Sequence, residues 1–228
     1  MIPFEDYLLN ESIQQLIDIA DQLHLMPEEG IQKIINDPMY GAKRSPENYM
    51  REFKLMAQFR AQFGYAIPCK EAIEAIRTHN NGDVLIDLMA GTGYWTQVLQ
   101  SAGIAVKAYD LDPGKGGMYG MQGVRAGVRV KTKDAIDAVD IATRWSQQND
   151  KKANFFMSWP PYDEPIGAEV AKRMLPGSIL FYIGEGGGGC TGCDQFHAIL
   201  NDQFDRLDTE TIPQFDGMHD YLMIYRKK

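Results

Sequence analysis

Two glycines and two carboxylates near the middle of the chain have the types and the spacing of a nucleotide-binding site. Gly91 and Gly93 come soon after a short apolar run that ends at Asp87, and a helix-like run follows them. The order of strand, tight glycine turn and helix is that of nucleotide-binding βαβ units. Glycine has no Cβ, so a ligand can lie against the backbone there. The next expected strand, 104–110, ends in Asp110, where a carboxylate can accept both ribose hydroxyls of an adenosine group.

The glycine turn differs from the fingerprint of dinucleotide-binding proteins. That fingerprint has a third glycine, three residues after the second, which lets the helix pack closely on the strand. Thr96 stands at that place, beside the bulky Trp95. The sequence therefore disfavours NAD and FAD, and a glycine turn with a purely structural role stays open as an alternative.

A second group of candidate residues follows an apolar strand that begins at Asn154. Pro160 and Pro161 must end this strand, because proline has no N–H to donate to a ladder. In an open α/β sheet, ligands lie beyond the carboxyl ends of the strands. We therefore expect the segment from Trp159 to Tyr162 to lie near the glycine turn.

These segments resemble the motifs of class I S-adenosylmethionine-dependent methyltransferases. The stretch that contains Asp87, Ala90, Gly91 and Gly93 is similar to the family's first motif, and Asp110 matches the acid that ends its second strand. The resemblance implies an α/β fold, with a mostly parallel Rossmann-like methyltransferase sheet and a C-terminal antiparallel hairpin. It also implies S-adenosyl-L-methionine as the cofactor.

Two further positions extend the resemblance, which covers residues 65–228. Asp134 is similar to the family's acid that contacts the adenine amino group, and capping the helix expected over 135–145 is compatible with that role. Tyr65 lies in a segment that is similar to one preceding the glycine turn in some amino-group methyltransferases. Ile67 stands where those enzymes commonly have threonine. The resemblance implies a cofactor contact for Asp134 and for Tyr65.

The acids near the glycines have alternative roles. Asp87 either holds the glycine turn or bonds the methionine ammonium of the cofactor, and the two roles are compatible. Asp112, which precedes a proline, is the alternative to Asp110 for the contact with the ribose.

The double proline resembles the (N/D/S)-P-P-(Y/F/W) motif of amino-group methyltransferases. The resemblance implies that the Pro160 carbonyl accepts a hydrogen bond from the target amine and that Tyr162 stacks on a planar acceptor. Trp159 occupies the motif's polar position, and Ser158 comes one residue earlier. Because a strand alternates its faces, Ser158 and Trp159 cannot both point at the acceptor unless the chain bends. A structural turn after a buried strand is the alternative.

The remaining chain indicates two domains. Helical periodicity over residues 1–82 predicts an N-terminal helical cap or extension, and residues 83–228 form the predicted cofactor-binding domain. Strands expected over 204–212 and 221–226 are joined through an Asp-Gly pair, which is typical of a hairpin.

Composition favours a cytoplasmic protein. The chain has 228 residues, a hydrophobic fraction of 44%, three cysteines and no apolar run that could span a membrane. Its formal net charge of −8 disfavours binding to extended duplex DNA without excluding a local basic patch. Residues 114–133 contain basic side chains and no acid, which predicts a mobile solvated loop or a site for an anionic substrate. These basic residues are Lys115, Arg125, Arg129, Lys131 and Lys133.

A glycine-rich segment, 186–192, follows another expected strand, and we expect it to be flexible. Glu185 precedes it as a candidate base or substrate ligand, or as a satisfied surface carboxylate. The sequence Y-I-G-E with a later T-G matches a poorly characterised methyltransferase-like family. Cys190 and Cys193 have C-x-x-C spacing, but a zinc site needs four ligands, so we expect no metal.

The sequence thus predicts a methyltransferase that acts on an amino or sp² nitrogen of a small molecule, nucleobase or protein side chain. An adenine-N6 nucleic-acid methyltransferase is one alternative, and an NAD-dependent oxidoreductase or a non-catalytic cofactor-binding protein is another. The candidate catalytic residues are Ser158, Trp159, Pro160 and Tyr162. The candidate cofactor-binding residues are Tyr65, Asp87, Ala90, Gly91, Gly93, Asp110 and Asp134.

Overall fold

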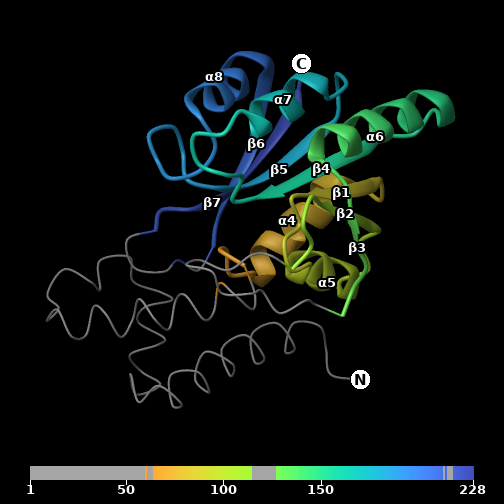
Figure 1. Cartoon of the computed structure of the whole chain (residues 1–228), viewed down its shortest axis with the longest axis horizontal. Coiled ribbons are helices and arrows are strands. Elements are labelled where there is room, and N and C mark those ends of the chain that lie inside the picture. Colours follow the sequence, from red (N-terminus) through yellow and green to blue (C-terminus); the bar gives the residue numbers. More distant parts are fainter. Residues whose placement is uncertain (1–59, 61–63, 115–126, 213, 215–217) are drawn as a thin grey trace, which may run out of the picture.

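The computed structural model describes residues 60, 64–114, 127–212, 214 and 218–228, and Figure 1 shows their arrangement. The helices predicted within residues 1–59, most of the basic loop and the Asp-Gly pair of the hairpin lie outside the described residues. The division of the chain at residue 82 into two domains stays a prediction.

One seven-stranded sheet organises the described part of the chain. Its order is β3-β2-β1-β4-β5-β7-β6, and β7 runs antiparallel to both β5 and β6 while the other pairs are parallel. The predicted α/β fold, with a mostly parallel sheet and a final antiparallel pair of strands, is therefore confirmed. The strands are β1 Val84–Leu88, β2 Val106–Asp110, β3 Val130–Thr132, β4 Ala153–Ser158, β5 Ile179–Gly184, β6 Phe204–Thr211 and β7 Tyr221–Lys227.

Helices cover both faces of this sheet, as Figure 1 shows, with α6, α7 and α8 on one face and α4 and α5 on the other. The central strands are buried on both sides, and their side chains alternate between the two cores. In β4, for example, Phe155 and Met157 pack under the first group of helices and Phe156 under the second. The helices are α4 Lys70–Asn80, α5 Tyr94–Ser101, α6 Ala135–Asn149, α7 Ile166–Arg173 and α8 Asp194–Gln203.

Helix α4 begins after Pro68 and ends at the Asn-Asn-Gly sequence, within the segment for which the sequence predicts helices. Asn81 caps its carboxyl end in the left-handed region, with φ of 50°. Ala72, Ile73 and Ile76 are buried in the same core as α5. The helix thus packs on the sheet directly. Within the described residues, no helix has the length and the apolar character that crossing a membrane requires.

Candidate functional site

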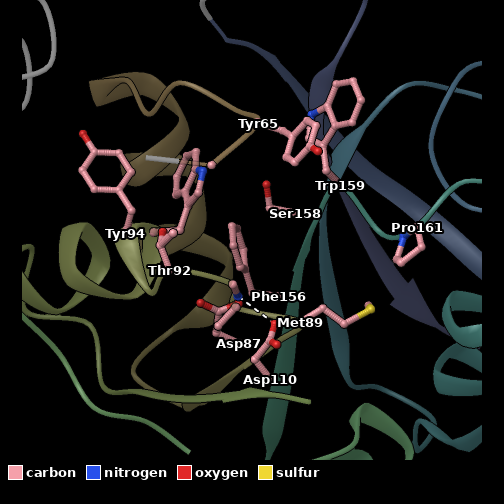
Figure 2. A pocket seen from close by; sticks show the side chains of 14 residues that line it. Tyr65, Asp87, Met89, Thr92, Tyr94, Asp110, Phe156, Ser158, Trp159 and Pro161 are labelled. Carbon is pink, nitrogen blue, oxygen red and sulfur yellow. Dashed lines mark hydrogen bonds between the residues drawn. The ribbon is translucent and has the colours of Figure 1, made fainter. Parts of the chain in front are cut away.

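A pocket lies where the carboxyl ends of β1, β2 and β4 meet, and Figure 2 shows the side chains around it. This is the edge of a parallel sheet at which ligands bind. Its walls come from the segment before α4, the glycine turn, the start of α5 and the ends of the three strands. The lining residues are Gly64, Tyr65, Asp87, Met89, Ala90, Gly91, Thr92, Tyr94, Trp95, Asp110, Phe156, Ser158, Trp159 and Pro161.

The glycine turn is held by backbone hydrogen bonds to the neighbouring strand and to itself. The N–H of Ala90 donates to the carbonyl of Tyr109 at 3.0 Å, and the N–H of Gly93 donates to the carbonyl of Ala90 at 2.8 Å. Gly91 and Gly93 have φ of 54° and 83°, a region that favours glycine. A Cβ added at Gly91 would meet nothing within 4 Å apart from the adjoining residues of the chain. The turn therefore leaves open space at Gly91, on the lining of the pocket.

Asp110 reaches back from β2 to this turn. Its two carboxylate oxygens accept hydrogen bonds from the N–H groups of Gly91 and Asp112, each at 2.8 Å. Asp110 lines the pocket, whereas Asp112 does not. The carboxylate therefore holds the glycine turn in place, and an ionised carboxylate has further lone pairs with which to accept ligand hydroxyls.

Asp87 lies at the bottom of the pocket and is 2% exposed. It accepts a hydrogen bond from the hydroxyl of Thr96, the residue at the place of the third glycine of a dinucleotide fingerprint. Burial raises the pKa of the Asp87 carboxyl to about 7, the hydrogen bond from Thr96 opposes this rise, and the charge of Asp110 adds to it. Thr96 is itself fully buried, so it fills the space in which a dinucleotide-binding protein would have a glycine.

The chain bends at the end of β4, which brings neighbouring side chains to one pocket. Trp159 has φ of 54°, and its N–H donates to the carbonyl of Ile183 at 2.8 Å. Because of this bend, Ser158 and Trp159 both line the pocket, although a regular strand would turn them to opposite faces. The structure thus contains the bend that the sequence alone left open.

Trp159 stacks on Tyr65, with ring centroids 5.2 Å apart and an interplanar angle of 23°. In Figure 2 these two rings lie together at one end of the view, and Asp87 and Asp110 lie at the other end. Ser158 lies between the aromatic pair and Phe156. The pocket therefore has an acidic end beside the glycine turn and an aromatic end beside the double proline.

Four predicted site residues do not line this pocket. Gly93 caps the amino end of α5. Asp134 caps α6, and its side chain accepts a hydrogen bond from the N–H of Ile136 at 2.7 Å. The Pro160 carbonyl accepts the N–H of Gly192 at 3.1 Å.

Tyr162, the fourth, is 67% exposed. Its ring is thus available to a ligand only outside the pocket, while Pro161, which precedes it, lines the cavity.

Several lining residues were not predicted from the sequence. Thr92 and Tyr94 lie in or beside the glycine motif, so their position there was a signal that could have found them. The rings of Trp95 and Phe156 look like ordinary core residues in a sequence, and both are in fact buried in the core, 5% and 0% exposed. The two rings lie against each other where α5 meets β4, and they form the buried wall behind the pocket.

The Glu185 carboxylate is a structural group in this arrangement. It is 7% exposed, and its two oxygens accept the N–H groups of His219 at 2.9 Å and Cys190 at 2.6 Å. Glu185 is not among the residues that line the pocket. It therefore ties the glycine-rich segment to the start of β7. Within the described residues, no cluster of His, Cys, Asp and Glu side chains is arranged to hold a metal ion.

Thr191 completes the hydrogen bonds of the glycine-rich segment. Its hydroxyl lies 2.6 Å from the Tyr182 hydroxyl, accepts the N–H of Glu185 at 2.8 Å and is 3.1 Å from the Glu185 carbonyl. Thr191 is 1% exposed, so removing the hydroxyl leaves buried groups without a partner. The Y-I-G-E and T-G sequences are thus two sides of one hydrogen-bonded turn.

We expect Thr191→Val to lower the free energy of unfolding by about 1–3 kcal/mol, the cost of leaving a buried polar group unpaired. Urea denaturation of the variant and the native protein measures this difference. Thr209→Val is the matched control, because Thr209 is an exposed threonine of β6. Equal stability of both variants would contradict the structural role of the Thr191 hydroxyl.

No protein-family model and no curated protein matches the chain. Among solved structures, the chain is similar to a magnesium protoporphyrin IX methyltransferase from Synechocystis PCC 6803 with bound S-adenosylmethionine. The identity is 15%, the match covers 93% of this chain and 97% of the other, and the TM-score is 0.45. It is also similar to a 1,6-didemethyltoxoflavin-N1-methyltransferase from Burkholderia thailandensis, with 15% identity, coverage of 70% and 77%, and a TM-score of 0.39.

Proposed function

We propose that the chain is an S-adenosyl-L-methionine-dependent methyltransferase whose acceptor atom is an amino or sp² nitrogen. The observation that carries this proposal is the layout of one pocket. The glycine turn, Asp87 and Asp110 line its acidic end, and Ser158 and Trp159 line its aromatic end. Such a layout offers one half of the pocket to a nucleoside cofactor and the other half to an acceptor.

The residues at the acidic end fit an adenosyl amino acid. Asp110 has carboxylate lone pairs for the ribose hydroxyls, and Gly91 leaves open space against its backbone. Asp87 is the buried carboxyl at the bottom of the pocket, where it would meet the ammonium of the methionine moiety. Asp134 does not line the pocket, so only the resemblance to the family's motif supports the proposed contact between Asp134 and the adenine.

When bound, the cofactor supplies a methyl group on a positively charged sulfur. Transfer would break the S–C bond and form an N–C bond, the sulfur would keep the electron pair of the broken bond, and the acceptor nitrogen would release a proton to solvent. The protein's part in such a reaction is to orient the acceptor and to exclude water. At the aromatic end, the rings of Tyr65 and Trp159 exclude water, and the Ser158 hydroxyl is the polar group that can orient an amine.

Ser158 would then donate or accept the hydrogen bond to the target amine. In the (N/D/S)-P-P-(Y/F/W) motif that this segment resembles, the first residue has that role. The Pro160 carbonyl already accepts the N–H of Gly192, and it has one further lone pair for an amine. Tyr162 lies outside the pocket, which fits a planar acceptor only if part of that acceptor extends toward solvent. A small molecule, a nucleobase or a protein side chain is compatible with this arrangement.

The net charge of −8 supports a small or locally held acceptor over extended duplex DNA. We keep the cytoplasm as the proposed location, which agrees with three cysteines that are all free. The buried Thr96 at the third-glycine position disfavours the NAD-dependent alternative.

Two experiments test the proposed function. Isothermal titration with S-adenosylhomocysteine and, separately, with NAD distinguishes a methyltransferase from a dinucleotide enzyme. Incubation with S-adenosylmethionine labelled on its methyl group, in the presence of DNA, RNA, protein or metabolite extracts, identifies the class of acceptor. Binding of NAD and no binding of S-adenosylhomocysteine would refute the proposal.

We expect Asp110→Asn to weaken S-adenosylhomocysteine binding by about 1–3 kcal/mol, the usual loss for charge-assisted hydrogen bonds. Asparagine keeps one acceptor oxygen for the N–H of Gly91, so the turn is better preserved than in an alanine variant. Titration calorimetry measures the affinity. Asp112→Asn serves as the control, because Asp112 does not line the pocket. A larger loss in Asp112→Asn than in Asp110→Asn would assign the ribose contact to Asp112.

A further inference from the structure

The indole of Trp159 is held by a carboxyl group that comes 61 positions later in the sequence. Its Nε1–H donates to Oδ2 of Asp220 at 2.9 Å. Asp220 immediately precedes β7, which is antiparallel to β5. The carboxyl is 2% exposed, and its residue has no place in the sequence motifs. It is thus a buried acidic group in contact with the aromatic end of the pocket.

Trp159 needs such a support because its backbone is strained. A φ of 54° lies in the left-handed region, which costs roughly 1–2 kcal/mol for a residue with a Cβ. A bulky residue there is an outlier that persists only when its surroundings hold it. Three contacts do so here: the backbone bond to Ile183, the stack on Tyr65 and the indole bond to Asp220.

Two charged groups, Arg60 and Glu185, act on this contact. The Arg60 guanidinium lies 5.0 Å from the Tyr65 ring centroid and 6.0 Å from that of Trp159. Burial raises the pKa of Asp220 to about 6. The bond from Trp159 and the charge of Arg60 oppose that rise, and the charge of Glu185 adds to it. The indole therefore bonds a carboxyl whose pKa is shifted in opposite directions by one cationic and one acidic neighbour.

We propose that Asp220 is a positioning residue for methyl transfer, which fixes the Trp159 indole against Tyr65 and so sets the shape of the acceptor end of the pocket. This inference rests on the proposed function of the same pocket. Asp220 does not line the pocket, so it acts through Trp159. The role explains why the first position of the double-proline motif can hold a tryptophan. The indole N–H is occupied by Asp220, and the ring is left as an apolar wall for a flat acceptor.

Two substitutions remove this hydrogen bond from opposite sides. Asp220→Leu removes the acceptor while keeping a side chain of similar size, and Trp159→Phe removes the donor while keeping an aromatic ring. Asp220→Asn is the conservative variant, because its amide oxygen still accepts the indole N–H. Asp205→Leu is the matched control, because Asp205 is an exposed acid on the neighbouring strand β6.

The probes are S-adenosylhomocysteine for the affinity of the cofactor site and methyl-labelled S-adenosylmethionine with a metabolite, nucleic-acid or protein extract for transfer. For Asp220→Leu we expect the transfer rate to fall about tenfold or more, while the dissociation constant of S-adenosylhomocysteine stays within about twofold. Asp220→Asn should recover most of the rate, and Asp205→Leu should match the native protein. Circular dichroism in the near ultraviolet should lose part of the tryptophan signal only in Asp220→Leu and Trp159→Phe.

A double-mutant cycle separates positioning from a general effect on stability. If Asp220 acts through the indole, Asp220→Leu should cause little further loss of rate in the Trp159→Phe background. Additive losses, or a native transfer rate in Asp220→Leu, would overturn the inference. If Asp220→Leu does not fold, Trp159→Phe and Asp220→Asn still test the positioning role of Asp220. Equal transfer rates in Trp159→Phe and the native protein would also overturn that role. No transfer and no S-adenosylhomocysteine binding by the native protein would instead refute the proposed function itself.

Discussion

Gly91→Val should weaken S-adenosylhomocysteine binding by about 100-fold or more, roughly 2.7 kcal/mol, while the protein remains folded. Apart from the adjoining residues of the chain, nothing lies within 4 Å of the position that a Cβ would take at Gly91. The new Cβ therefore clashes with no side chain packed against the turn. It fills space on the lining of the pocket, where the proposed cofactor must approach the backbone. Titration calorimetry measures the affinity, and circular dichroism checks the fold.

A second valine substitution separates this loss from backbone strain. Gly91 has φ of 54°, so a valine there is strained whatever space it finds. Gly82 also has a positive φ, 79°, and open space around its Cβ position, but it precedes β1 and does not line the pocket. Gly82→Val should therefore lose stability and keep its affinity for S-adenosylhomocysteine. Equal affinities in Gly82→Val and Gly91→Val would remove the glycine turn from the proposed cofactor site.

The part of the site that the sequence predicts is the part built from neighbouring residues. Gly91 and Asp87 belong to one strand and one turn, and their spacing determines the local geometry. The carboxyl ends of parallel strands meet at one edge, so Asp110 and Ser158 could be placed there without knowledge of a single side-chain contact. All four residues line the pocket.

The aromatic end of the pocket could not be predicted in the same way. Trp159 reaches the pocket because its φ is positive, and nothing in a tryptophan residue indicates such a backbone. Its support comes from Asp220, which is 61 positions away in the sequence. Glu185 illustrates the same difficulty, because its position at a strand end suits a catalytic acid. Only the hydrogen bonds from Cys190 and His219 show that the carboxylate holds a loop.

The unliganded protein should become less stable as the pH rises from about 4 to about 7, in part because of Asp87. Burial raises the pKa of this carboxyl from 3.8 to about 7 in the folded state. In that window the unfolded chain has released the proton and the folded protein still binds it, so stability falls as the pH rises. The slope is roughly 1.4 kcal/mol per pH unit for one proton. Asp220, whose pKa is also raised, contributes in the same direction. The contribution of Asp87 is therefore the difference between the native protein and an Asp87→Asn variant in how the free energy of unfolding changes with pH.

Affinity for S-adenosylhomocysteine should change in the opposite direction over the upper part of this window. The proposed contact places the ligand's ammonium beside Asp87, and that contact favours the ionised carboxyl. Below about pH 7 the ligand must therefore displace a proton, and its dissociation constant should rise about tenfold for each further pH unit. The nearby charge of Asp110, which opposes ionisation of Asp87, would be offset by the same ammonium. Titration calorimetry from about pH 5 to about pH 8 measures the dependence, and buffers of different ionisation enthalpy report the released proton.

Asp87→Asn tests both halves of this argument in one variant. It removes the titrating proton, so affinity should be low and nearly independent of pH, while stability near pH 7 should rise or stay level. Thr96 donates its hydroxyl to the Asp87 carboxyl, and the asparagine oxygen can accept the same bond, so the turn keeps its support. The native protein should therefore gain affinity as it loses stability with rising pH. The variant should keep a nearly constant affinity and lose only the stability that other groups, such as Asp220, account for. An affinity of the native protein that is constant between about pH 5 and about pH 8 would show that the ammonium lies elsewhere. Asp87 would then be left with the structural role of holding the glycine turn through Thr96.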